Sequence, residues 1–244
     1  MHCRQTLFPP AVPRYWSFGT STVRKDALGA WFSCRPQVTS QRLKRCIISN
    51  STNNPLNTAT NSNIANFTAP GLDESKARKA IAILDARMVA LIDLGLTLKH
   101  VHWNVVGPNF IGVHEMLDPQ VDAIREMVDQ VAERIATLGG VPVGTPAAIV
   151  ERRDWNDYSL GRALVVEHLG ALDLVYSGVN ADHRRAIDAL AEVDPVSEDM
   201  ITGHLGDLEQ FQWFVRAHLE SAAGELPTVD SKTEKGAARA ASDS

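Results

Sequence analysis

Imidazole and carboxylate side chains gather in one stretch of the sequence, residues 99–133. The stretch holds five candidate metal ligands, namely His102, His114, Asp118, Asp129 and Glu133. Neutral imidazole nitrogens combined with anionic carboxylate oxygens suit a first-row transition metal such as Fe(II). The stretch therefore predicts a site for a first-row metal, whose ligands must be positioned by the elements on which they lie.

The second half of this stretch has the periodicity of a helix. Apolar residues recur every three or four positions, at Val121, Ile124, Val128, Val131, Ile135 and Leu138. This pattern is typical of an amphipathic helix packed in a bundle. Four carboxylates each come one residue after a core position, namely those of Asp118, Asp122, Asp129 and Glu133. They therefore form a second stripe about 100° round the helix from the apolar stripe. Acidic residues alone would indicate a solvated face, but the two nearby histidines favour a metal site.

The length of such a helix constrains the site. Asp118 and Asp129 are eleven residues apart, which separates them by about 16 Å on a helix that rises about 1.5 Å per residue. His114 and Glu133 are farther apart still, so one ion cannot bind at both ends. Either the chain carries two half-sites, or a two-fold axis brings the histidine end of one subunit against the Asp129 and Glu133 end of another.

The motif HWNVVGPNFIGVHEMLD at 102–118, followed by DQVAER at 129–134, resembles the signature of the Dps family of mini-ferritins. Together with FQWFVRAHLES at 211–221, it is most similar to the actinobacterial branch, and the resemblance covers about residues 66–226. The resemblance implies that the five candidate ligands form a ferroxidase site shared by two-fold-related subunits. It also implies a hollow homo-oligomer, by analogy a dodecamer, that oxidises iron preferably with hydrogen peroxide.

The expected fold is all-α, a ferritin-like four-helix bundle. We expect helices over about 73–104, from the GPNF turn at 107 to about 138, over 160–192 and over 197–223. Pro119 either kinks the second helix or, with Asp118, begins a separate one. The long link over 141–158 allows a crossover of the ferritin kind, and the family resemblance implies a short extra helix near 146–151.

Other side chains receive structural interpretations. Four histidines without an acidic partner pattern are expected to pack or lie at the surface, namely His168, His183, His204 and His218. Trp213 and Phe214 are expected in the core or an interface. Trp103 either packs or, by family analogy, lies near the iron. No Glu stands three residues before any His, so the intra-bundle di-iron site of larger ferritins, built from Glu-x-x-His pairs, is not expected.

Charge divides the chain into unlike parts. Residues 1–66 carry eight basic side chains and one acidic one, a balance of +7, whereas the rest carries 16 basic and 28 acidic, a balance of −12. The first part has no sustained periodicity and is expected to be a disordered extension. It could be a targeting peptide, a basic arm for nucleic acid, or the product of a start site placed too far upstream. Residues 67–225 are expected to form the bundle, and 226–244 a flexible tail.

Two functions follow. The first is a ferroxidase that oxidises Fe(II) and stores ferric mineral, thereby protecting DNA from Fenton chemistry. The second is a nucleoid protein that coats DNA through its basic extension, because the acidic bundle repels phosphate and the C-terminal tail is near neutral. No run of 18 apolar residues occurs, so no membrane span is expected. A cytoplasmic location, associated with the nucleoid if DNA is bound, is expected.

Overall fold

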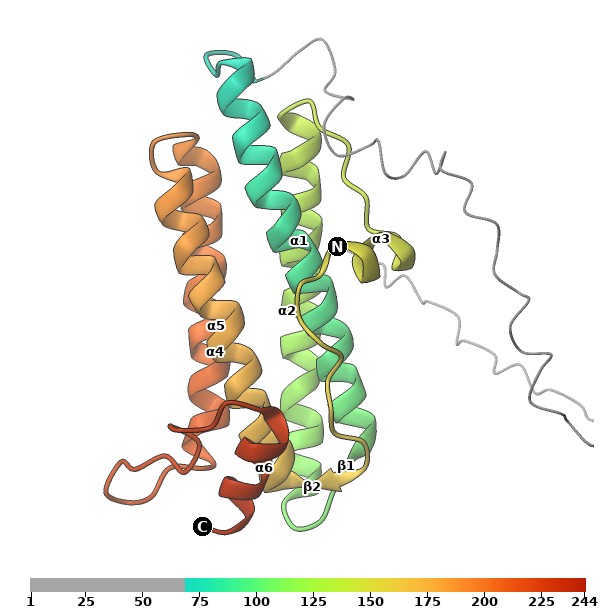
Figure 1. Ribbon diagram of the computed structural model, residues 1–244, viewed down its shortest axis with the longest axis vertical. Coiled ribbons are helices and arrows are strands. Elements are labelled where there is room, and N and C mark those ends of the chain that lie inside the picture. Colours follow the sequence, from blue (N-terminus) through green and yellow to red (C-terminus); the bar gives the residue numbers. More distant parts are fainter. Residues whose placement is uncertain (1–68) are drawn as a thin grey trace, which may run out of the picture. The chain divides into compact units, whose positions relative to one another are not determined.

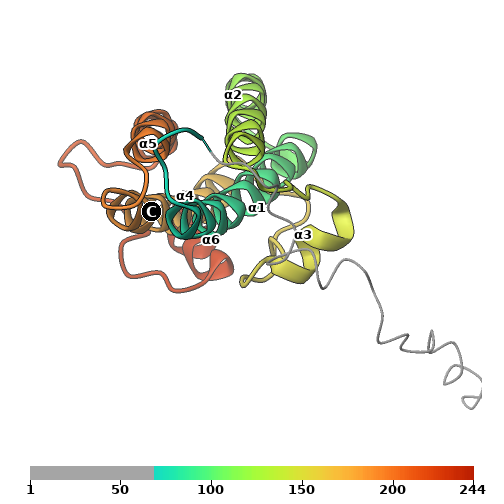
Figure 2. The ribbon, with the colours of Figure 1, turned by 90° about the horizontal axis from the view of Figure 1, so that it is seen from above.

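Four long helices account for most of the computed structural model, which describes residues 69–244 (Figure 1). They are α1 (Glu74–Asn104), α2 (Phe110–Thr137), α4 (Val165–Leu190) and α5 (Pro195–Ala217). Helices α1 and α2 form one hairpin, α4 and α5 form another, and α1 packs on α4 between them (Figure 2). The predicted all-α, ferritin-like four-helix bundle is therefore confirmed. Within residues 69–244, no helix combines the length and the apolarity needed to cross a membrane.

The apolar seams predicted from the sequence form one continuous core. Leu84, Leu91, Leu98, Ile124 and Leu172 are fully buried in it. Burial of such side chains is the main favourable contribution to folding, at about 1.5–3 kcal/mol each. The helix expected over 197–223 is shorter than predicted, because α5 ends at Ala217 and residue 222 is exposed.

Helix α2 runs without interruption through Pro119. The alternative that Asp118 and Pro119 begin a separate helix is therefore wrong. The turn before α2 is built by Gly107 and Asn109, which both adopt the left-handed backbone conformation, with φ of 99° and 61°. Glycine and asparagine tolerate this conformation best. These two residues reverse the chain so that α2 runs back along α1.

The long link between α2 and α4 carries the predicted short helix, α3 (Pro146–Arg152). Polar contacts hold the link against α1. Arg153 binds Asp93 at 3.1 Å, and the Trp155 indole donates to Asp93 at 2.7 Å. The sequence did not predict a two-stranded parallel ladder in which β1 (Val105–Val106) pairs with β2 (Ala163–Leu164). This ladder joins the C-terminal end of α1 to the start of α4.

The C-terminal segment contradicts the prediction of a flexible tail over 226–244. Residues Glu234–Ser242 form helix α6, which packs on α4. Ala237 and Ala241 lie against Gly170, where an added Cβ would come within 2.6 Å of the Ala237 carbonyl oxygen. The Thr228 hydroxyl also donates to the Asp173 carboxylate at 2.7 Å. The predicted disorder of residues 1–66 lies outside the described residues.

Three of the four histidines given a structural interpretation are buried, namely His168, His183 and His204, while His218 is exposed. The packing-or-surface interpretation is therefore confirmed. His183 and His204 lie on neighbouring helices of the α4–α5 hairpin, and the His204 ring pairs with Gln130 of α2 at 2.8 Å. Burial, with smaller effects from Arg87 and His204, lowers the pKa of His183 to about 4. Trp213 is 57% exposed and therefore does not belong to the core.

The close approach of α6 to α4 leads to a first prediction. Substitution Gly170→Ala should displace α6, because the new methyl group would overlap the Ala237 carbonyl. Amides of residues 234–242 should then lose protection in hydrogen exchange. Gly178→Ala is the matched control on the same helix, since nothing lies within 4 Å of its added Cβ, and it should raise stability by up to about 1 kcal/mol. Equal protection in both variants would contradict the docking described here.

A second prediction concerns acid stability. The depressed pKa of His183 means that the unfolded chain binds a proton there more readily than the folded chain does. Stability is therefore lost as the pH falls from about 6.5 towards 4. Between pH 7.5 and 5.0 the wild type should lose about 2 kcal/mol more unfolding free energy than the variant His183→Gln. Urea unfolding at both pH values measures the difference, and equal losses would refute this role of His183.

Candidate metal centre

Three of the five predicted ligands are neighbours at the turn end of the α1–α2 hairpin, on either side of the connection over 105–109. His102 lies in the last turn of α1, whereas His114 and Asp118 lie in the first turns of α2. The two imidazole rings stack, with centroids 3.6 Å apart and planes inclined by 22°. One Asp118 carboxylate oxygen lies 3.3 Å from the Nδ1 atom of His102. The hairpin thus assembles two nitrogen donors and one carboxylate.

Reciprocal hydrogen bonds fix the tautomer of both histidines. The Nδ1 atom of His102 donates to the His114 carbonyl, and Nδ1 of His114 donates to the His102 carbonyl, each at 2.9 Å. Because a carbonyl oxygen only accepts, each Nδ1 carries a proton, so in the neutral ring the lone pair lies on Nε2. Metal-bound histidines are commonly oriented by such a bond to backbone. Nε2 is therefore the atom through which each ring, in its neutral form, could bind a metal.

A cation already neutralises the carboxylate of this group. Lys99, one turn before His102, donates to Asp118 at 2.7 Å and lies 5.9 Å from the Trp103 ring centroid. The Lys99 hydrogen bond, helped by the Lys99 charge, holds the pKa of Asp118 below its usual value. Asp118 is therefore ionised at neutral pH. The sequence analysis missed Lys99, although its position one turn from His102 was a usable signal.

Exposure differs sharply among these side chains. His102 is buried, with 7% of its surface exposed, whereas the Asp118 side chain is 52% exposed. Trp103 is 71% exposed, so core packing within its own subunit does not account for this residue. Its expected nearness to iron stays a prediction. The candidate centre thus opens outward, away from the core of the subunit that carries it.

The other two predicted ligands lie farther along α2. Asp129 and Glu133 are exposed and are separated from Asp118 by the helical rise, about 16 Å for Asp129. Within residues 69–244 of one subunit, no three His, Cys, Asp or Glu side chains converge where a metal ion would fit. A single subunit therefore holds His102, His114 and Asp118 near one another without forming a complete three-ligand metal site from them, and it leaves Asp129 and Glu133 apart.

Comparison with known proteins identifies the fold and the family. The ferritin-like domain family matches residues 81–223. The "DNA protection during starvation protein" of Mycolicibacterium smegmatis is 58% identical over 175 residues, which cover 72% of this chain and 96% of that protein. The chain belongs to the ferritin-like Dps family. Among solved structures, Mycobacterium smegmatis Dps is 58% identical over 70% of this chain and 97% of its own, with a TM-score of 0.68.

A second Dps structure agrees with this assignment. DpsA14 from Streptomyces coelicolor is 60% identical over 67% of this chain and 97% of its own, with a TM-score of 0.66. The resemblance to Dps that rested on the motif at 102–118 is therefore confirmed. Dps membership also agrees with the long crossover between α2 and α4. The identity of the five ligands stays a prediction.

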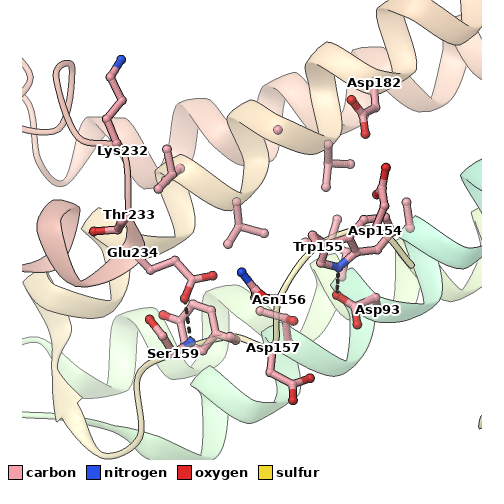
Figure 3. A pocket seen from close by; sticks show the side chains of 18 of the residues that line it. Asp93, Asp154, Trp155, Asn156, Asp157, Ser159, Asp182, Lys232, Thr233 and Glu234 are labelled. Carbon is pink, nitrogen blue, oxygen red and sulfur yellow. Dashed lines mark hydrogen bonds between the residues drawn. The ribbon is translucent and has the colours of Figure 1, made fainter. Parts of the chain in front are cut away.

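A cavity of about 700 Å³ lies elsewhere, between α1, α4, the 154–159 loop and residues 232–235 (Figure 3). Its lining includes the apolar residues Leu94 and Val175. Two carboxylates at its edge already have partners, because Asp93 accepts from Trp155, and Glu234 accepts from the Ser159 backbone at 2.6 Å. None of the five predicted ligands lines this cavity, so it is separate from the candidate metal centre.

Proposed function

We propose that the protein oxidises Fe(II) at a site built by two subunits and stores the ferric product inside a hollow homo-oligomer, by family analogy a dodecamer. The arrangement of the two histidines carries the proposal, because their Nδ1 protons are held by carbonyls and both Nε2 atoms are free to bind. His102, His114 and Asp118 would supply one half of the site. Asp129 and Glu133 of the partner subunit would supply the other half.

The donor set fits the chemistry of iron. Imidazole nitrogens and carboxylate oxygens bind Fe(II), and the negative carboxylates favour Fe(III) after oxidation. Hydrogen peroxide, the oxidant by family analogy, takes one electron from each of two Fe(II) ions. Its O–O bond breaks, and two protons complete two water molecules. The acidic excess of residues 67–244 would attract iron cations towards the shell.

Protection of DNA follows from the same reaction. Fenton chemistry needs both Fe(II) and hydrogen peroxide, and this reaction consumes both. The name of the relative from Mycolicibacterium smegmatis, "DNA protection during starvation protein", supports this role. We place the protein in the cytoplasm, where DNA and iron meet.

A third prediction tests whether the site is shared. One variant carries His102→Ala and His114→Ala, and the other carries Asp129→Ala and Glu133→Ala. Each alone should assemble but oxidise Fe(II) poorly, because every shared site lacks half of its ligands. After the two are unfolded and refolded together, a hybrid two-fold pair has one intact site. Oxidation should then return to roughly a quarter of the wild-type sites if pairing is random.

Two controls make this test decisive. Subunit exchange is verified by mass tagging, and assembly by sedimentation. The variant Asp122→Ala with Glu126→Ala removes two carboxylates from the same helix outside the proposed ligand set and should oxidise iron nearly as the wild type does. Mixed shells that exchange subunits yet stay inactive would show that the site is not shared between chains.

DNA binding through the N-terminal extension is a second candidate function. The charge balance of +7 over residues 1–66 favours it, against −12 for the remainder. A fourth prediction follows, that the full chain binds duplex DNA with a steep salt dependence whereas a chain starting at Phe67 binds weakly. Fluorescence anisotropy at several salt concentrations measures both. Equal binding by the two chains would instead assign the contact to the bundle or the C-terminal segment.

A further inference from the structure

Helix α2 carries four of the five proposed ligands but is unevenly supported. It packs along α1, whereas its contacts with the α4–α5 hairpin are sparse (Figure 2). The backbone of α2 therefore lies close to one neighbouring helix, α1, although its buried apolar side chains belong to the common core. Directional polar contacts with the α4–α5 hairpin can then fix the rotation and axial position of α2 relative to that hairpin.

Polar side chains provide these contacts at three levels of α2. Near its first third, Gln120 accepts a hydrogen bond from Tyr176 of α4 at 2.8 Å. Farther along, Gln130 pairs with the His204 ring of α5 at 2.8 Å. Near its end, Arg134 donates to Asp194 at 2.6 Å. Each contact joins α2 to the α4–α5 hairpin.

The contact between Gln120 and Tyr176 is the most deeply buried of the three. Tyr176 is fully buried, and Gln120 is only 1% exposed. Burial raises the pKa of the Tyr176 hydroxyl, so this group stays protonated and always donates. Within the described part of the chain, the Gln120 Nε2 atom has no hydrogen-bond partner. The Tyr176 hydroxyl is therefore the contact that fixes the orientation of this amide.

Gln120 also follows directly after Pro119, where α2 lacks one helical hydrogen bond. Pro119 has no N–H and leaves the Glu115 carbonyl without its helical donor, although the helix continues through it. His114 and Asp118 precede this point, and Asp129 follows it. A change in bend or rotation at Pro119 would therefore move the two sets of ligands relative to each other.

We propose that Tyr176 is a positioning residue for the iron site. By binding Gln120, it holds α2 at Pro119 so that the ligands on either side keep the rotation and spacing that sharing between two subunits requires. Tyr176 lies in the bundle core and touches no proposed ligand, so it acts only through α2. This role rests on the proposed function.

The test uses Tyr176→Phe in the assembled protein, with Zn²⁺ as a redox-inert probe. Calorimetric titration should show Zn²⁺ binding about ten-fold weaker than in the wild type, which is typical when support around a metal site is lost. The initial rate of Fe(II) oxidation should fall in parallel. Tyr158→Phe is the matched control, because it also removes a tyrosine hydroxyl bonded inside the protein, to His168 at 3.0 Å, without touching α2. It should bind Zn²⁺ as the wild type does.

A second variant separates positioning from stability. Tyr176→Phe leaves the buried Gln120 amide without its hydrogen-bond donor and should lower the unfolding free energy. The double variant Tyr176→Phe, Gln120→Met also removes that amide and should restore most of the lost unfolding free energy. Zn²⁺ binding should stay weak in this double variant, because the connection between α2 and α4 is still missing. Recovery of binding together with stability would overturn the positioning role, as would unchanged binding in Tyr176→Phe. A wild type that fails to bind Zn²⁺ at the proposed ligands would overturn the proposed function as well.

Discussion

The fixed rise of the α-helix is the constraint on which the candidate centre depends. Helix α2 is continuous from Phe110 to Thr137, so no local rearrangement can bring Asp129 to the histidine pair about 16 Å away. Under the proposed function, folding of one subunit therefore produces only half-sites. Assembly would create the complete site, which couples oxidation of iron to the presence of a shell that can store the product.

The contacts that hold α2 in the subunit are related to the position of its proposed ligands. A helix that presents ligands on its outer face cannot also be covered on that face by its own bundle, so apolar packing on α1 has to be supplemented by other contacts. Gln120, Gln130 and Arg134 provide them at three heights. Hydrogen bonds are directional, so they fix rotation about the helix axis better than apolar contacts, which tolerate small slides.

The four long helices could be predicted because each buries a stripe of large apolar residues, and this repeat is visible without any neighbour. Helix α6 could not, because its buried face consists of small residues such as Ala237 and Ala241 that give no strong repeat. Its stability depends on the gap left by Gly170 in another helix. In the candidate centre, the residue types and their spacing could be read from the sequence. The stacking of His102 on His114 could not, because it depends on the backbone conformation of the turn at Gly107 and Asn109.

The docking of α6 on α4 has a practical consequence for attaching cargo. Because Glu234–Ser242 is anchored through Ala237 and Ala241, a peptide appended after Ser244 would leave the subunit from a defined point beside α4. Fluorophores or antigens attached there would have restricted distances from one another on an assembled particle. The same attachment to a free tail would spread them over a broad range of distances.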